Sequence, residues 1–196
     1  MRISIGNDHR GSAVKRKVIE LVRRLGHEVQ DFGAVDDGAV DYPDFAYVVA
    51  QAVAQSRFDR GILICGSGVG MSIAANKVRG VRAALCHDDL SAEMSRRHND
   101  ANVLCLAADL LGERFIERIV EIWLSTEFEG GRHARRVEKI RRIEDEEYKS
   151  GAWNGSSIPS PAKQQGPQLS SAALGAEHDE ALRPATMSNV SAFRDR

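Results

Sequence analysis

The sequence has few cysteines, almost no net charge and no long hydrophobic run. Cys65, Cys86 and Cys105 are odd in number and form no CxxC pair, which argues against a disulfide framework or a structural zinc site and favours a reducing cytosol. The formal net charge of −1 argues against a polyanionic partner such as nucleic acid. No apolar run is long enough to span a bilayer, and the amino terminus lacks the apolar core of a signal peptide. We therefore expect a cytoplasmic protein that binds neither nucleic acid nor membrane.

Residues 150–196 differ in composition from the rest of the 196-residue chain. The segment is rich in Ser, Pro, Gly, Gln and Ala without sustained hydrophobic periodicity, so it cannot bury enough apolar area to offset its ordering entropy. The composition predicts one domain over residues 1–149 and a disordered tail after it; docking of Trp153 or Phe193 on a neighbour is the alternative. We expect truncation after Ser150 to leave catalysis and the melting temperature nearly unchanged.

Short apolar strands alternate with amphipathic helices over residues 1–149. The first strand covers Ile3–Gly6, the second lies in HEVQDFG, the third covers Gly61–Cys65, and VRAALC and NVLCLAA supply two more. This alternation predicts an α/β fold, a doubly wound three-layer sandwich whose five-stranded parallel sheet has the order 2-1-3-4-5. Ligands bind in such folds at the carboxyl ends of strands 1 and 3, where the winding reverses.

The loops at these two strand ends are Asn7–Gly11 (NDHRG) and Cys65–Gly70 (CGSGVG). Gly66, Gly68 and Gly70 allow a tight turn that presents backbone amides at a helix amino terminus, where they stabilise an anion or a developing oxyanion. The spacing matches neither the GxGxxG fingerprint of dinucleotide-binding folds nor a P-loop, because no GK[ST] follows. A glycine-rich turn required only by sterics is the plain alternative.

Cys65 lies directly before these amides. A helix amino terminus favours the thiolate form of a cysteine, which can act as a nucleophile or a base. The alternative is a buried structural cysteine, which is the interpretation that we give to Cys86 and Cys105. Ser67 places a hydroxyl beside the same pocket, or it is an ordinary turn serine.

Asp8 and His9 in the first loop and two arginines farther along the chain are further polar candidates. An Asp–His pair in a cleft can exchange protons or orient hydroxyls, whereas Asp8 alone can also be a helix N-cap. Arg132 and Arg136 are four residues apart, so a helix places them on one face, where paired arginines suit a phosphate. From spacing alone, a solvated charged face is the favoured interpretation of these arginines.

Five segments match a known family in the right order: DHRG, VDYPDFA, RGILICGSGVGMSIAANKVRGVRAALCHD, RRHNDANVL and EFEGGRHARRV. In these motifs the chain closely resembles the B-type ribose-5-phosphate isomerases, a family that also includes bacterial galactose-6-phosphate isomerase subunits. The resemblance runs from residue 1 to about residue 145 and excludes the tail. It implies an enzyme of the pentose phosphate pathway that interconverts ribose 5-phosphate and ribulose 5-phosphate without a metal or other cofactor.

The resemblance also implies a role for each matching residue. It makes Cys65 the base that moves a proton between C1 and C2 through a cis-enediolate, Ser67 its assistant, and His98 the group that opens the furanose ring. The loop amides that it implies for the enediolate oxygen are those of Gly66, Gly68, Val69 and Gly70. The remaining substrate contacts that it implies are Asp8 beside His98, Asn99 at the sugar hydroxyls, Tyr42 on the pocket wall, and His9, Arg132 and Arg136 at the phosphate.

His98 and Asn99 lie on a predicted helix that begins at Leu90 and runs antiparallel to the strands. The end of this helix therefore lies at the opposite edge of the sheet from Cys65, and strands of ordinary length separate the two edges by roughly 17–20 Å. One subunit can hardly join them, so a second copy should supply His98 and Asn99. We expect a homodimer with shared active sites as the minimum functional unit, and the sequence leaves a tetramer open.

Asp109 departs from the family pattern, which has an arginine at this position that contacts the substrate phosphate. A carboxylate there repels a phosphate dianion. Either Asp109 points away while Arg114 or another cation compensates, or the pocket prefers a substrate whose phosphate lies elsewhere or is missing. We expect Asp109 to weaken the binding of ribose 5-phosphate, so that Asp109→Arg lowers the Michaelis constant and leaves the turnover number within a few-fold.

Two other functions are compatible with the sequence. One is an isomerase of another sugar phosphate, such as allose 6-phosphate, galactose 6-phosphate or a tetrose phosphate. The other is a non-catalytic phosphosugar-binding module, against which Cys65 and His98 argue because binding alone needs neither. A redox role of Cys65 has less support, because no resolving cysteine lies nearby in the sequence.

Overall fold

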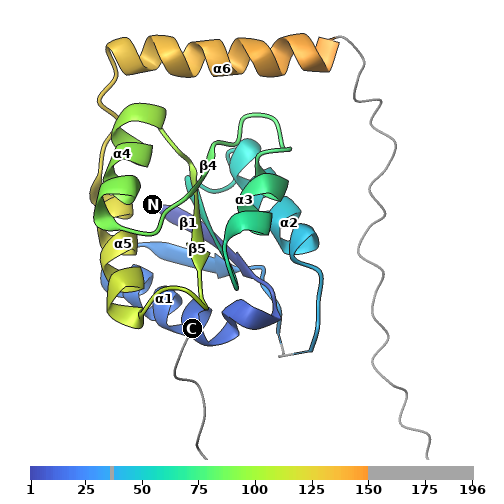
Figure 1. Cartoon of the computed structure of the whole chain (residues 1–196), viewed down its shortest axis with the longest axis vertical. Coiled ribbons are helices and arrows are strands. Elements are labelled where there is room, and N and C mark those ends of the chain that lie inside the picture. Colours follow the sequence, from blue (N-terminus) through green and yellow to red (C-terminus); the bar gives the residue numbers. More distant parts are fainter. Residues whose placement is uncertain (36–37, 150–196) are drawn as a thin grey trace, which may run out of the picture. The chain divides into compact units, whose positions relative to one another are not determined.

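The computed structural model describes residues 1–35 and 38–149 (Figure 1), so the predicted tail over residues 150–196 lies outside the described residues. Strands and helices alternate along the chain, as the sequence predicted. The strands are β1 (Arg2–Asn7), β2 (Glu28–Asp31), β3 (Arg60–Cys65), β4 (Ala83–Leu85) and β5 (Val103–Ala107). The helices are η1 (His9–Gly11), α1 (Ser12–Arg24), α2 (Tyr42–Ala54), α3 (Val69–Ala75), α4 (Asp89–Asn99), α5 (Glu113–Ser125) and α6 (Arg132–Lys149).

These strands form one parallel sheet in the order β2-β1-β3-β5-β4. The predicted order 2-1-3-4-5 is wrong for the last two strands, because β5 pairs with β3 and leaves β4 at the edge. Burial gives the physical reason. β5 is apolar and buried along its whole length, as suits a central strand, whereas β4 has three residues that are only partly buried.

Helices cover both faces of the sheet and give the predicted three layers (Figure 1). On one face, α1, α4 and α5 pack on the sheet through an apolar cluster that includes Val18, Ala92 and Trp123. On the other face, α2 and α3 pack through a second cluster that includes Val49 and Met71. Within residues 1–35 and 38–149, no helix is long and apolar enough to cross a membrane.

The ends of α4 are fixed by two aspartates, and this matters because α4 carries His98. Asp88 forms a capping box at the amino terminus of the helix. Asp100 follows the last turn with a φ of +47°, a left-handed conformation that ends the helix. The chain then reaches the start of the central strands, where the Gly61 amide donates to the Asn102 carbonyl at 2.9 Å. His98 therefore lies near the edge at which the strands begin.

α6 packs against α4 and continues past it (Figure 1). Its first turn contacts the end of α4 through stacked rings of His98 and His133. Its last turns contact the loop before β4, where Arg79 pairs with Asp145 and lies over the Tyr148 ring, 5.1 Å from the ring centroid. α6 is thus attached to the domain at both ends.

Candidate active site

Polar loops follow β1, β3 and β5 at the carboxyl edge of the sheet. The Asp8 amide donates to the Ile64 carbonyl at 3.2 Å, and the Ala108 amide donates to the Cys65 carbonyl at 2.8 Å. These bonds continue the strand ladders past the last strand residues, so the three loops lie side by side. The structure therefore brings together the two loops that the sequence placed at the site, and it adds the loop that carries Asp109.

Cys65 ends β3 with its thiol inside the glycine loop. The residue is 5% exposed, and the Gly68 amide donates to its Sγ at 3.1 Å. Gly68 has a φ of +73°, and a Cβ there would lie 2.4 Å from Leu85 Cδ1, so glycine is required at this turn. An amide donor stabilises a thiolate more than a thiol. The loop therefore places a backbone N–H donor on the sulfur of Cys65.

Cys86 and Cys105 are buried in the two apolar clusters, in agreement with a structural role. Burial raises the pKa of Cys86, and burial followed by the neighbouring thiols raises the pKa of Cys105 well above its ordinary value. Both thiols therefore stay protonated near neutral pH. All three cysteines are free, so Cys65 is not held in a disulfide.

Asp8 and His9 line the neighbouring loop. The Asp8 carboxylate caps η1 by accepting a hydrogen bond from the Arg10 amide at 2.9 Å, so the N-cap interpretation is confirmed. The residue is also 6% exposed, which keeps this carboxylate in place at the edge of the site. His9 Nδ1 accepts a hydrogen bond from the Val40 amide at 3.4 Å, so a neutral His9 carries its proton on Nε2. His9 can thus donate Nε2–H to an anion.

Tyr42 and Ser67 flank the glycine loop. A Cβ on Gly70 would lie 2.6 Å from Tyr42 Cζ, so the tyrosine ring rests directly on the loop backbone. Ser67 is exposed, and its Oγ accepts a hydrogen bond from the Val69 amide at 3.4 Å, as a turn serine does. Both side chains lie at the glycine loop, and their contact with a substrate stays a prediction.

Asp109 faces the glycine loop instead of pointing away from it. Its amide donates to the Gly66 carbonyl at 3.0 Å, and a Cβ on Gly66 would lie 2.6 Å from Asp109 Oδ2. Arg10 pairs with the same oxygen, through Nε at 3.0 Å and Nη2 at 2.9 Å. Of the two alternatives given for Asp109, the one in which it points away is wrong, and the cation that pairs with it is Arg10 instead of Arg114.

His98 lies at the amino edge of the sheet, at the end of α4. Its ring stacks on His133 of α6 with 4.1 Å between centroids and 1° between planes. Arg132 Nε donates to His133 Nε2 at 3.2 Å, and Glu129 lies 4.0 Å from His98 Nε2. Burial, and then the electrostatic effect of His98 and Arg132, lowers the pKa of His133, so the His133 ring is held neutral near physiological pH. A neutral His133 gives His98 an uncharged surface to stack on.

His98, Glu129 and His133 also offer ligand atoms that lie within 4.8 Å of one another, a spacing that a metal ion could use. The lone pairs of a histidine lie in the plane of its ring. Because the two rings are parallel and stacked, their lone pairs run in parallel and do not converge on one point. A metal would need one ring to turn out of the stack, so the described arrangement is a ring pair and not a metal centre.

Arg132 and Arg136 lie on α6, one turn apart, which confirms that a helix places them on one face. Both are exposed. They belong to the same edge as His98, since Arg132 contacts His133 and the charge of Arg136 also acts on that ring. The predicted site residues thus form two groups at opposite edges of the sheet, one around Cys65 and one around His98.

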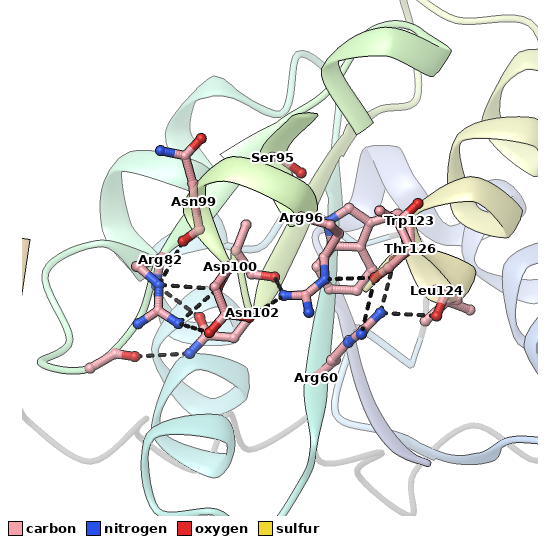
Figure 2. A network of polar contacts seen from close by, with 12 residues as sticks. Arg60, Arg82, Ser95, Arg96, Asn99, Asp100, Asn102, Trp123, Leu124 and Thr126 are labelled. Atoms are coloured by element: carbon pink, nitrogen blue, oxygen red, sulfur yellow. Dashed lines mark hydrogen bonds and ion pairs between the residues drawn. The ribbon is translucent and has the colours of Figure 1, made fainter. Parts of the chain in front are cut away.

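A network of hydrogen bonds and ion pairs next to Asn99 fixes the carboxyl-terminal end of α4 (Figure 2). Asp100 accepts from Arg82 Nη2 at 3.0 Å with one oxygen and from Arg96 Nη1 at 2.9 Å with the other. Arg82 Nε also donates to the Asn99 carbonyl at 3.0 Å. Sequence reasoning missed this network, although the RRHNDAN motif does place an arginine four residues before Asp100.

A third arginine completes the network. Arg60 begins β3 and donates Nη1 to the carbonyls of Trp123 at 2.8 Å and Leu124 at 3.0 Å (Figure 2). Burial, and then the charge of Arg96, lowers the pKa of Arg60 to about 10, which still leaves it charged at neutral pH. The carbonyls at the end of α5 therefore accept from a buried cation, and this joins α5 to the strand that carries Cys65 at its other end.

We expect Asp100→Asn to lower the free energy of unfolding by about 1–3 kcal/mol, because Arg82 and Arg96 lose a charged acceptor while asparagine keeps the left-handed turn. The matched control is Asp145→Asn, which breaks the exposed pair with Arg79 and should cost less than about 1 kcal/mol. Urea unfolding of the two variants measures the difference. Equal losses would show that the network does not hold the end of α4.

A model of the Ribose/Galactose Isomerase family matches residues 3–140, which include both groups of site residues. The chain belongs to this family. The ribose/galactose isomerase family model matches more than half of the chain, and the motif resemblance described above is thereby confirmed.

Individual members of the family are also similar to this chain. Ribose-5-phosphate isomerase B of Escherichia coli is 46% identical over 143 residues, which are 73% of this chain and 96% of that protein. D-erythrulose-4-phosphate isomerase of Pectobacterium atrosepticum is 41% identical over 148 residues, which are 75% of this chain and 97% of that protein. The structure of ribose-5-phosphate isomerase B from Mycoplasma genitalium with bound ribulose-5-phosphate matches with a TM-score of 0.72 and 45% identity, over 74% of this chain and 97% of that chain.

Proposed function

We propose that this chain is an aldose–ketose isomerase that interconverts ribose 5-phosphate and ribulose 5-phosphate through a cis-enediolate. The observation that carries the proposal is the Cys65 thiol, buried at the carboxyl edge with the Gly68 amide on its Sγ at 3.1 Å. Family membership supports it, as does the ribulose-5-phosphate bound to the Mycoplasma genitalium relative. The three free cysteines are compatible with the cytosol, where we place this activity.

The proposed reaction moves one proton between neighbouring carbons of the open-chain sugar. The Cys65 thiolate removes the proton from C2 of the aldose to give the enediolate, and the hydroxyl proton on the C2 oxygen passes to the C1 oxygen. The Cys65 thiol then returns a proton to C1, which gives the ketose and restores the thiolate. Negative charge develops on the substrate oxygen, and the amides of Gly66, Gly68, Val69 and Gly70 stabilise it. Ser67 assists at the same edge.

We propose that the second half of each active site comes from another copy of the chain. His98, which opens the furanose ring with Asp8, lies at the opposite edge from Cys65, and an ordinary strand separates the edges by roughly 17–20 Å. Val69 and Ile73 support this arrangement, because these apolar side chains lie exposed on α3 beside the glycine loop, at 46% and 57% exposure. A second copy that covers them would bring its own His98 and Asn99 to Cys65.

The same arrangement assigns the phosphate contacts to both copies. His9 donates Nε2–H from the subunit that supplies Cys65, because Val40 occupies its Nδ1. Arg132 and Arg136 come with His98 from the other copy, because all three lie at the amino edge. Two arginines on one helix face suit a phosphate dianion. Tyr42 lines the pocket next to the glycine loop, in the subunit that supplies Cys65.

A second candidate is an isomerase of a different sugar phosphate. The specific observation in its favour is the relative from Pectobacterium atrosepticum, a D-erythrulose-4-phosphate isomerase with 41% identity. Allose 6-phosphate and galactose 6-phosphate are further substrates of the same chemical class. A phosphosugar-binding module without catalysis has less support, since binding alone needs neither the thiol of Cys65 nor the imidazole of His98.

A panel of aldose phosphates with four to six carbons separates these functions. We expect ribose 5-phosphate to give the highest kcat/KM and EDTA to leave the rate unchanged, because the proton transfer uses the protein's own thiol. A higher kcat/KM for a tetrose or hexose phosphate would favour the second candidate. Binding of the sugar phosphates without turnover would instead favour the non-catalytic module and contradict the proposal.

A further inference from the structure

Arg10 lies across the mouth of the glycine loop. It follows His9 on η1, and its Cβ is 3.8 Å from the position of a Cβ on Gly66. Its guanidinium reaches Asp109 at the end of the neighbouring loop, where Nε and Nη2 both contact Oδ2 at 3.0 and 2.9 Å. The absence of a side chain on Gly66 permits this, because a Cβ there would lie 2.6 Å from the same oxygen. Three loops of the site thus meet at one ion pair.

The ion pair with Asp109 uses only some of the N–H donors of Arg10. A guanidinium has five N–H donors in a planar fork, and two of its nitrogens here contact a single carboxylate oxygen. The Arg10 side chain is 58% exposed, so its other donors are accessible to a ligand at the mouth of the loop. Asp109 contacts one edge of the Arg10 guanidinium and leaves the N–H donors of the other edge open to a second acceptor.

The charge of the edge requires such a cation. Asp8 and Asp109 place two carboxylates beside the loop in which the enediolate forms. The titratable residues of η1 are His9 and Arg10. A phosphate dianion that enters from this side meets Asp109 as a like charge unless Arg10 lies between them. Arginine suits this position because its fork can bind a carboxylate and a phosphate oxygen at once.

We propose that Arg10 is a specificity-determining residue that binds the phosphate of the substrate, with Asp109 as the residue that positions its guanidinium. The proposal rests on the proposed isomerase function. It names Arg10 as the cation that acts beside His9 and comes from the subunit that supplies Cys65. It also gives Asp109 a role that is compatible with a substrate that carries a phosphate.

Steady-state kinetics of Arg10→Gln test this assignment. We expect the KM for ribose 5-phosphate to rise about tenfold or more, since a charge-assisted hydrogen bond to phosphate is lost, while kcat stays within a few-fold. The inhibition constant of inorganic phosphate should rise with it. The matched control is Arg114→Gln, an exposed arginine in the first turn of α5, which should leave the KM within twofold. A KM of Arg10→Gln within twofold of the wild type would overturn the proposal.

The double variant Arg10→Gln/Asp109→Asn distinguishes phosphate binding from simple neutralisation of Asp109. If Arg10 binds phosphate, the double variant recovers only part of the loss, because the repelling carboxylate is gone but the cation is still missing. A return to the wild-type KM would show that Arg10 only screens Asp109, and the proposal would be wrong.

Binding in a Cys65→Ala background separates this proposal from the proposed function. Calorimetry of that variant should give a dissociation constant for ribose 5-phosphate that rises about tenfold or more when Arg10→Gln is added. That result together with an inactive wild type would contradict the isomerase function and leave the phosphate site standing. An active wild type together with an unchanged dissociation constant would contradict the phosphate site at Arg10 and leave the isomerase function standing.

Discussion

A Cys65→Ala variant should lose about 10²–10⁴-fold in turnover number toward ribose 5-phosphate, the usual cost of removing a positioned base. In the proposed mechanism the Cys65 thiol moves the proton, and its neighbours at the carboxyl edge offer no replacement at the same place. Asp8 is held by the Arg10 amide at 2.9 Å, and Ser67 is an exposed alcohol that accepts from the Val69 amide. The KM should change much less, because the phosphate and hydroxyl contacts are intact.

The matched control is Cys86→Ala, which removes a buried thiol outside the site. It should lower the melting temperature, since it leaves a small cavity in the core, and leave the turnover number within a few-fold. Circular dichroism should show that Cys65→Ala keeps the wild-type fold. A Cys65→Ala variant with near-normal turnover would contradict the proposed mechanism.

The layers of the fold could be predicted from the sequence because strand and helix periodicities differ along the chain. The order of the last two strands could not be predicted from connection lengths alone. It follows from burial: β5 is apolar throughout and lies in the centre, while the short β4 lies at the edge. Weighing the lengths and apolar character of VRAALC and NVLCLAA would have favoured the observed order.

The position of His98 at the opposite edge from Cys65 could also be predicted, because the direction of a helix that follows a parallel strand is fixed. His98 lies where that argument placed it, at the end of α4 beside the start of the strands. Its stack on His133 could not be foreseen, since it depends on how the first turn of α6 docks.

The ion pair between Arg10 and Asp109 was beyond the reach of the sequence for a different reason. Its residues are far apart in the chain, and although Asp109 departs from the family pattern, nothing in the sequence identifies Arg10 as its partner. They meet only because two loops converge on Gly66, which lacks a side chain. The network of Arg82, Arg96 and Asp100 has the same origin, since its charges come from separate elements.

The central claim is that Cys65 of one copy acts with His98 of another, and mixing two inactive variants tests it. Cys65→Ala lacks the base, and His98→Asn lacks the ring-opening group, so each homodimer should be nearly inactive. In a mixed dimer, the site that joins the intact Cys65 of one copy to the intact His98 of the other is complete. The second site of that dimer lacks both groups.

The measurement is the rate of ribulose 5-phosphate formation after equimolar variants are unfolded together and refolded, with each variant refolded alone as the control. Random pairing through a two-fold interface makes half of the dimers mixed, so about a quarter of the wild-type activity should return. Size-exclusion chromatography and differentially tagged subunits confirm that the mixed dimers are present. Mixed dimers that show no more activity than the separate variants would contradict the shared site.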